Sequence, residues 1–167
     1  IAYAPMSFSP PVPTSGSEEI VYVGRGCVDS DLTLEGNQPD PYLANPAGKA
    51  ALIDRGACGF GEKYSRAVAA GATSVVIANN VAGVVFGTLG AAPPAGVTAP
   101  AVGISLADGN FIKAQPAPVS IVWTEDQTTS PNPTAGLISS FSSYGLAPTL
   151  DLKPDVGAPG GSIYSTY

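Results

Sequence analysis

The chain has 167 residues, of which 44% are hydrophobic and only 12% charged, and it is rich in glycine (20) and proline (17). This length and composition fit about one domain with many strands and loops, and they argue against a helical bundle. The acidic balance, 13 Asp and Glu against 7 Lys and Arg, argues against nucleic-acid binding, and no apolar run approaches the ~20 residues that cross a bilayer.

The first segment, residues 1–17, is rich in proline and serine and is expected to be an extended leader. It has neither an initiator Met nor the charged-then-apolar pattern of a signal peptide, so we expect a processed form or a piece of a longer chain. The β-rich run EEIVYV at 18–23 predicts the first clear strand. A long polar connection over 27–48 leads to KAALI at 49–53, whose continuous apolar run predicts a central strand.

Apolar side chains recur with helical spacing between Phe60 and Ala70 and predict an amphipathic helix there. Gly71 stands where a left-handed cap would end that helix. The run TSVVIA at 73–78 predicts another buried strand, and GVVFG at 83–87 predicts a further short one. Strand, helix and strand in this order are typical of an α/β layout.

The next elements follow a proline-containing loop. APAVGIS at 99–105 predicts a strand, and Ser105 with Asp108 resembles a capping box that opens a short helix over 106–114. PVSIVWTE at 118–125 alternates between apolar and polar residues as a strand does.

The composition changes after these elements. The polar stretch 126–134 is interpreted as a linker, and the segment 135–167 is rich in Ser, Gly and Pro with short apolar runs. This last segment has the character of strands and turns taken from a larger body. Because unpaired backbone groups are costly when buried, we expect it to fold back on the preceding domain, to pair with a neighbouring molecule or to retain a partner.

Two cysteines, Cys27 and Cys58, each follow an Arg-Gly turn after a predicted strand. Strands that end side by side would bring the two thiols together, so we expect one disulfide and, with it, a secreted protein. Two unpaired buried thiols are the alternative.

Catalytic chemistry is scarce in this sequence. The chain contains no histidine, so a Ser-His-Asp triad or a His-containing zinc site cannot form within it. GACGFG at 56–61 lacks the Lys-Ser/Thr pair of a phosphate-binding loop. Asp29, Asp31 and Glu35 alternate as calcium ligands could, but a solvated acidic loop is the favoured interpretation. We therefore predict no metal, no cofactor and no catalytic residue.

Asp54 and Arg55 follow the strand at 49–53, at the kind of position where ligands meet α/β sheets. Turn chemistry and an ion pair are favoured over catalysis, because Asp54 has no acid–base partner in the sequence; the two residues remain candidates for binding. A set of aromatic residues could also form a binding surface, although their spacing favours core packing for most of them: Phe60, Tyr64, Phe86, Phe111 and Trp123.

Two stretches resemble known families. GKAALIDRGACGFGEKYSRAVAAGATSVVIANN (48–80), followed by VTAPAVGISLADGNFI (97–112), is similar to a protease-associated (PA) domain. The resemblance covers about residues 18–125 and implies a mixed α/β (α+β) fold, a small, partly open β-barrel or sandwich with two flanking helices. SSFSSYGLAPTLDLKPDVGAPGGSIYST (139–166) resembles the part of a subtilisin-like serine protease that precedes its catalytic serine.

Together these resemblances imply a non-catalytic protein-interaction or substrate-access module of a secreted, Vpr-like or fungal, subtilisin-like endopeptidase, with 135–167 as a stub of the protease domain. They also support a Cys27–Cys58 bridge and place Phe141 near the protease cleft. The implied partners are protein or peptide substrates, the parent protease domain and a second copy in a homodimer, with no nucleic acid and no membrane.

Two other interpretations remain open. The first is a stand-alone secreted binding protein, lectin-like or immunomodulatory, that reuses the PA scaffold. The second is a complete enzyme that uses paired Asp and Glu residues as glycosidases do; the sparse carboxylates disfavour it.

Overall fold

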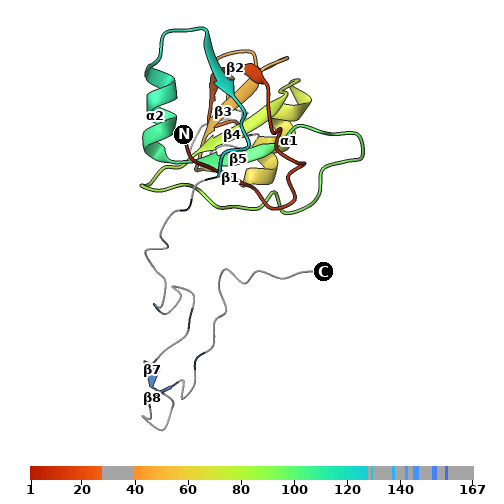
Figure 1. Cartoon of the computed structure of the whole chain (residues 1–167). Helices are drawn as coiled ribbons and strands as arrows, with labels where there is room; N and C mark the ends of the chain where they lie inside the picture. The colour runs from red at the N-terminus through yellow and green to blue at the C-terminus, as the bar shows by residue number, and fades with distance from the viewer. Residues whose placement is uncertain are drawn as a thin grey trace. The chain divides into compact units, whose positions relative to one another are not determined.

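The computed structural model divides the chain into two units, Ile1–Gln127 and Thr128–Tyr167 (Figure 1). The residues that it describes are 1–27, 40–127, 129, 137, 142, 145–146, 152–153 and 157. Asp29, Asp31, Glu35 and Phe141 lie outside them, so the predictions for these residues stay predictions. Within the described part, none of the helices combines the length and apolar character needed to cross a bilayer.

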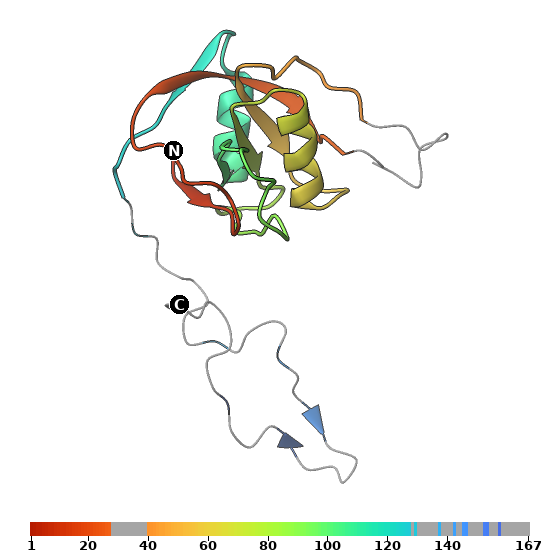
Figure 2. The same cartoon turned by 90° about the vertical axis from the view of Figure 1, so that its right-hand side faces the viewer.

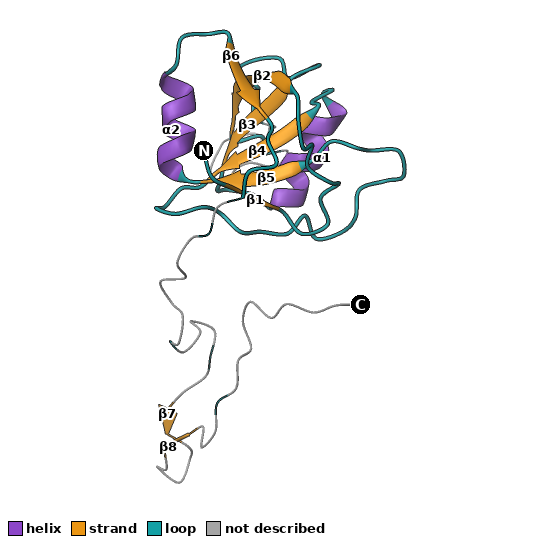
Figure 3. Ribbon diagram, viewed as in Figure 1, coloured by secondary structure: helices purple, strands orange, loops and turns teal. Residues whose placement is uncertain are grey.

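Unit 1 is built on a curled six-stranded sheet, a half-barrel, with the strand order β1-β5-β4-β3-β2-β6 (Figure 3). The strands are β1 (Tyr3–Pro5), β2 (Ser17–Gly24), β3 (Ala50–Asp54), β4 (Ser74–Ala78), β5 (Ala101–Ile104) and β6 (Val119–Val122). Strands β2 to β5 run parallel, while β1 and β6 pair antiparallel at the two edges. All residues of β4 and β5 are buried, as expected for parallel strands covered on both faces.

Two helices, α1 (Phe60–Ala69) and α2 (Leu106–Ala114), cover opposite faces of this sheet (Figures 2 and 3). Tyr64 and Ala67 of α1 pack into the core cluster on one face. Ile112 of α2 packs with Trp123 into the cluster on the other face. The mixed α/β fold with a partly open barrel and two flanking helices, as predicted from the sequence, is confirmed.

Helix ends follow local signals in the sequence. The Ser105 Oγ accepts a hydrogen bond from the Asp108 backbone N–H at 3.0 Å and donates one to the Asp108 carboxylate at 2.6 Å, which caps α2. Gly71 adopts a φ of 87° just past α1, and its N–H donates to the Val68 carbonyl at 2.9 Å. The left-handed glycine therefore satisfies one of the carbonyls that the end of α1 leaves without a partner inside the helix.

The N-terminal segment contributes to the sheet. Residues 1–17 are predicted only to be an extended leader, whereas the structure pairs Tyr3 with Ile104 in an antiparallel ladder between β1 and β5. Met6, just past β1, is 3% exposed and belongs to the core. Unit 1 ends at Gln127, within the polar stretch 126–134.

A strand at 83–87 is not formed, so that prediction is wrong. Within 83–87 the structure shows one isolated bridge, between Val84 and Ser105. The Val85 carbonyl lies over the face of β5, where a Cβ added to Gly103 would come within 2.1 Å of the oxygen. The segment thus crosses over Gly103 instead of lengthening the sheet.

The described part of unit 2 contains one short antiparallel pair, β7 (Gly145–Leu146) with β8 (Leu152–Lys153). The partner predicted for the segment 135–167 remains a prediction.

A substitution at Gly109 tests the close packing of α2 on β4. A Cβ at Gly109 would lie 2.4 Å from the Ala78 Cβ. Gly109→Ala should therefore lower the free energy of unfolding by about 1–3 kcal/mol, although alanine favours helix by about 1 kcal/mol in an open site. Urea unfolding measures this, with Asn110→Ala, an exposed position of the same helix, as the control that should lose nothing. A more stable Gly109→Ala variant would contradict the close packing.

Candidate functional site

The candidate residues meet where parallel strands end. Asp54 is the last residue of β3, and Arg55 follows it. The neighbouring strand β2 ends at Gly24 and leads directly to Arg25 and Cys27. Side chains from both strands therefore meet at one edge of the sheet, as expected for parallel neighbours.

Asp54 is held by two partners. The Tyr22 hydroxyl donates to its Oδ2 at 2.6 Å, and the Lys113 ammonium lies 2.9 Å from its Oδ1. The Lys113 Nζ also lies 4.9 Å from the centre of the Tyr22 ring. Both oxygens of the carboxylate are thus engaged in joining β3 to β2 and α2. This geometry agrees with the favoured prediction of an ion pair, and it gives Asp54 a structural role.

The Asp54 carboxylate also affects Tyr22. Burial, and then the hydrogen bond to Asp54, raise the pKa of the Tyr22 hydroxyl to about 12. The hydroxyl therefore keeps its proton at neutral pH and acts as a donor.

Arg55 is exposed at the same edge. Its Nη1 donates to the Asn79 Oδ1 at 2.9 Å, and its guanidinium carbon lies 5.9 Å from the centre of the Phe60 ring. The Phe60 ring packs closely on Gly87, where an added Cβ would lie 2.6 Å from it. The next residue in the chain towards the N-terminus, Phe86, is 80% exposed. We refer to Arg55, Phe60 and Phe86 as the Arg55 surface, in which the Arg55 guanidinium contacts the Phe60 ring and Phe86, next to Gly87 in the sequence, is a nearby exposed aromatic residue.

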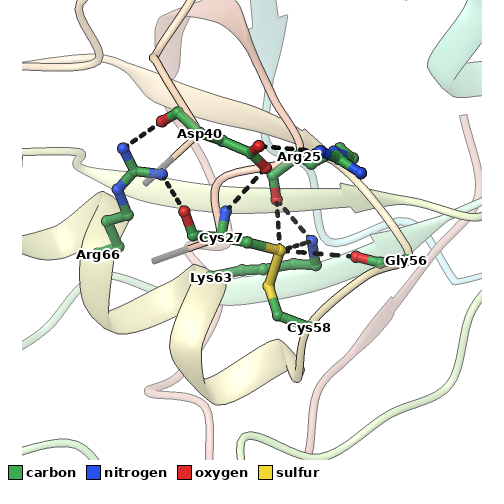
Figure 4. Close-up of a disulfide and its surroundings, with 7 residues drawn as sticks. All are labelled: Arg25, Cys27, Asp40, Gly56, Cys58, Lys63 and Arg66. Carbon is green, nitrogen blue, oxygen red and sulfur yellow. Dashed lines mark hydrogen bonds and ion pairs between the residues drawn. A yellow bond between two sulfur atoms is a disulfide. The ribbon is translucent and has the colours of Figure 1, made fainter. Parts of the chain in front are cut away.

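A disulfide joins Cys27 to Cys58, with the two Cα atoms 5.8 Å apart (Figure 4). It fixes the chain after β2 to the turn that precedes α1. The Cys27 side chain is fully buried, and Cys58 is partly exposed. The pairing is the single one that the sequence permits.

A fully buried lysine lies against this bridge. The Lys63 Nζ donates to the Arg25 carbonyl at 2.5 Å and lies 3.3 Å from the Cys27 Sγ (Figure 4). Burial lowers the pKa of Lys63 to about 8, while the Asp40 carboxylate acts in the opposite direction. At neutral pH the side chain is therefore still mainly an ammonium ion, held by a carbonyl and facing a sulfur.

Arg66 fastens α1 to two chain segments, the one that ends at Cys27 and the one that begins at Asp40. Its guanidinium donates to the Cys27 carbonyl at 2.6 Å and to the Asp40 carbonyl, and it lies 4.3 Å above the Tyr42 ring. The Asp40 carboxylate in turn lies 2.9 Å from the Arg25 guanidinium. The charges near the disulfide thus hold irregular backbone in place.

The side chains of Cys27, Cys58 and Glu62 lie within 4.8 Å of one another. Both sulfurs are bonded to each other, so neither is a thiolate that could bind a metal. The proximity therefore supports no metal site.

The contacts by which Lys63 and Arg66 anchor α1 near the disulfide were not predicted from the sequence. Position 63 lies three residues from Phe60 and four from Ala67, on the buried stripe of α1, so a lysine there was a visible anomaly. The predicted aromatic core is correct for Tyr64 and Trp123, which are 3% and 7% exposed. Phe60 is partly buried against the core, so core packing holds for most of the five, as predicted; Phe86 and Phe111, 80% and 59% exposed, are the exceptions.

Comparison with known proteins gives a consistent result. The model of a family described as PA domain matches residues 16–112. Leucine aminopeptidase 2 of Trichophyton rubrum is 38% identical over 104 residues, which cover 62% of this chain and 19% of that protein. The PII-type proteinase of Lactococcus lactis subsp. cremoris is 34% identical over 149 residues, covering 83% of this chain and 7% of that protein.

The solved structure of an aminopeptidase from Aneurinibacillus sp. strain AM-1 shares the fold, with a TM-score of 0.53 and 32% identity. The match covers 68% of this chain and 24% of that one. The chain thus spans about a fifth or less of the length of the two curated relatives. These relatives are named as aminopeptidases and a proteinase, and none of the names specifies a subtilisin-like enzyme.

The disulfide closes a loop with a sequence separation of 31 residues. Replacing both Cys27 and Cys58 by alanine should lower the free energy of unfolding by about 3–4 kcal/mol, because the unfolded chain regains the entropy of the open loop. Urea unfolding compared with the unaltered chain measures this loss. A loss below about 1 kcal/mol would show that the bridge adds little to a fold held by Lys63 and Arg66.

The raised pKa of Tyr22 predicts a pH effect. Its folded-state pKa of about 12 exceeds the ordinary value of 10.0, so its contribution to stability is complete below pH 10 and is lost as the pH rises toward 12. Because burial also raises the pKa of Tyr42 and Tyr64, absorbance titration at about 295 nm should show an ionisation near pH 12 whose amplitude Tyr22→Phe lowers by that of one tyrosine. If the amplitude is unchanged in the variant, another tyrosine is responsible.

Proposed function

This chain belongs to the PA domain family, and on that premise we propose that it is a non-catalytic interaction module of a larger, secreted peptidase. It would contact protein or peptide substrates and the catalytic domain of its parent. The observation that carries the proposal is the family match over 16–112, combined with an Asp54 carboxylate occupied by Tyr22 and Lys113. Function in such a module resides in its surface rather than in a reacting group.

The Arg55 surface is the proposed contact for a polypeptide. A guanidinium donates to carbonyl and carboxylate oxygens, and an exposed phenyl ring buries apolar side chains. Asn79, which is 5% exposed, accepts from Arg55 and orients it. Of the predicted binding residues, Arg55 is thus proposed as a direct contact, Asp54 as a support, and Phe141 keeps its proposed place near a protease cleft.

A subtilisin-like parent is the finer proposal. The tail motif at 139–166 supports it. The lactococcal match gives further support, because it covers 83% of the chain, which is about 139 residues. Unit 1 has 127 residues, so the similarity to the PII-type proteinase must extend beyond unit 1 into unit 2.

An aminopeptidase parent is the second candidate. Its support is the higher identity, 38%, to the fungal leucine aminopeptidase and the fold shared with the Aneurinibacillus aminopeptidase. The fungal match covers 62% of the chain and requires no residue beyond unit 1. The full coding sequence separates the two candidates: a Gly-Thr-Ser motif shortly downstream supports the subtilisin-like parent, and its absence supports the other.

Secretion is proposed on the strength of the disulfide, which persists in oxidising compartments. A stand-alone secreted binding protein and a homodimer remain alternatives. A stop codon directly after Tyr167 would favour the first, and native mass spectrometry of the purified chain tests the second.

The polypeptide contact can be tested with unfolded, fluorescently labelled casein. The unaltered chain should bind it without cleaving it, and Arg55→Ala should weaken binding about 5- to 10-fold, the usual loss of one charged contact. Lys49→Ala is the matched control, because Lys49 precedes β3 as Arg55 follows it and is paired with Glu19 at 2.7 Å. Fluorescence anisotropy measures binding, and gel electrophoresis measures cleavage.

Two outcomes would overturn the proposal. Turnover of casein by the pure chain would contradict a non-catalytic module. Equal losses for Arg55→Ala and Lys49→Ala would show that net charge, rather than the Arg55 surface, governs binding.

A further inference from the structure

The sulfurs of the disulfide lie in different surroundings. Cys27 is fully buried, and its Sγ has close neighbours in Lys63 Nζ at 3.3 Å, the Gly56 carbonyl at 3.7 Å and the Arg25 carbonyl at 3.9 Å. Cys58 is partly exposed, its backbone N–H donates to the Gly56 carbonyl at 2.9 Å, and the interactions marked in Figure 4 reach the Cys27 Sγ rather than the Cys58 Sγ. As a residue, Cys58 is therefore more accessible to a thiol that enters from solvent than the fully buried Cys27.

We propose that Cys58 is a site of S-thiolation. A small thiol attacks the Cys58 Sγ, Cys27 leaves as a thiolate, and the Lys63 ammonium stabilises the negative charge of that thiolate. Neither Cys58 nor Lys63 belongs to the Arg55 surface. The reagent it takes is a low-molecular-weight aliphatic thiol, such as a cysteine-containing peptide.

The step balances without a further reactant. The incoming thiolate forms a new bond to the Cys58 Sγ, the Cys27–Cys58 bond breaks, and its electron pair remains on the Cys27 Sγ. The products are a mixed disulfide at Cys58 and a thiolate at Cys27. Attack by Cys27 on the mixed disulfide reverses the step and releases the small thiol.

Local charge favours Cys27 as the leaving group. An ammonium 3.3 Å from a buried sulfur stabilises a negative charge there more than it would in water. Cys58 lies one residue before Gly59, the N-cap of α1, and thus near the partial positive charge of a helix N-terminus. That half charge is weaker than the whole charge of Lys63.

The other charged groups do not reverse this preference. The Glu62 carboxylate lies within 4.8 Å of both sulfurs and so opposes a thiolate at either one. Asp40 accepts from the Cys27 N–H at 3.4 Å, but its carboxylate is paired with Arg25. Arg66 adds a second cation close to the Cys27 backbone.

The position of the adduct is the primary test, and it requires no variant. The full chain is treated with a limiting amount of reduced glutathione near pH 7.5, quenched with acid, alkylated, digested without reduction and analysed by mass spectrometry. We expect glutathione on Cys58 and the alkyl group on Cys27 in at least a tenfold excess over the reverse, and a nearly even distribution in 8 M urea. A native adduct on Cys27, or an even distribution, would overturn the proposal.

The role of Lys63 is tested by kinetics. Lys63→Met should slow formation of the mixed disulfide about 3- to 10-fold, since a leaving thiol of higher pKa departs more slowly. Lys49→Met, which removes a lysine directly before the start of β3, should leave the rate unchanged. An equal rate in the Lys63 variant would overturn the assignment of Lys63.

A titration covers the case in which the Lys63 variant does not fold. In the unaltered chain that carries glutathione on Cys58, the rate of Cys27 alkylation against pH reports the pKa of the Cys27 thiol. We expect a value below the ordinary ~8.5. A value at or above it would show that Lys63 does not stabilise the thiolate, and would overturn its role.

Discussion

The parallel pairing of β3 with β4 is the constraint on which the rest of this fold depends. Both strands are buried almost throughout, so each face of the sheet needs a cover and each strand end needs partners for its last backbone and side-chain groups. The helices α1 and α2 provide the covers. The strand ends then bring Asp54, Arg55 and the chain after β2 together, which creates the candidate site as a consequence of the topology.

Much of this arrangement can be predicted from the sequence, because its signals are local. The apolar run of β3, the stripe of α1, the glycine at 71 and the capping serine at 105 each determine structure within a few residues. β1 could not be predicted in the same way. It has three residues, and its register depends on Ile104, which lies about a hundred positions away.

The site shows the same limit. Two cysteines permit one pairing, so their bridge could be predicted. The position of Lys63 depends on the Arg25 carbonyl, which only the end of β2 brings close, and no local pattern contains that information. The segment at Val85 was misjudged for a related reason: its place is set by the absence of a side chain at Gly103 on a different strand. Prediction thus fails where a residue's role depends on a distant partner.

The two helices are fastened to the sheet unequally. α1 is anchored by a covalent link next to its first turn, by the buried Lys63 and by Arg66, whereas the polar anchor of α2 is the ion pair between Lys113 and Asp54. Because local opening begins where the fewest strong contacts must break, α2 is the helix that is more easily released from the sheet. The α1 side of the domain is therefore held more firmly than the α2 side, and local opening of α2 would expose the apolar face around Ile112 and Trp123.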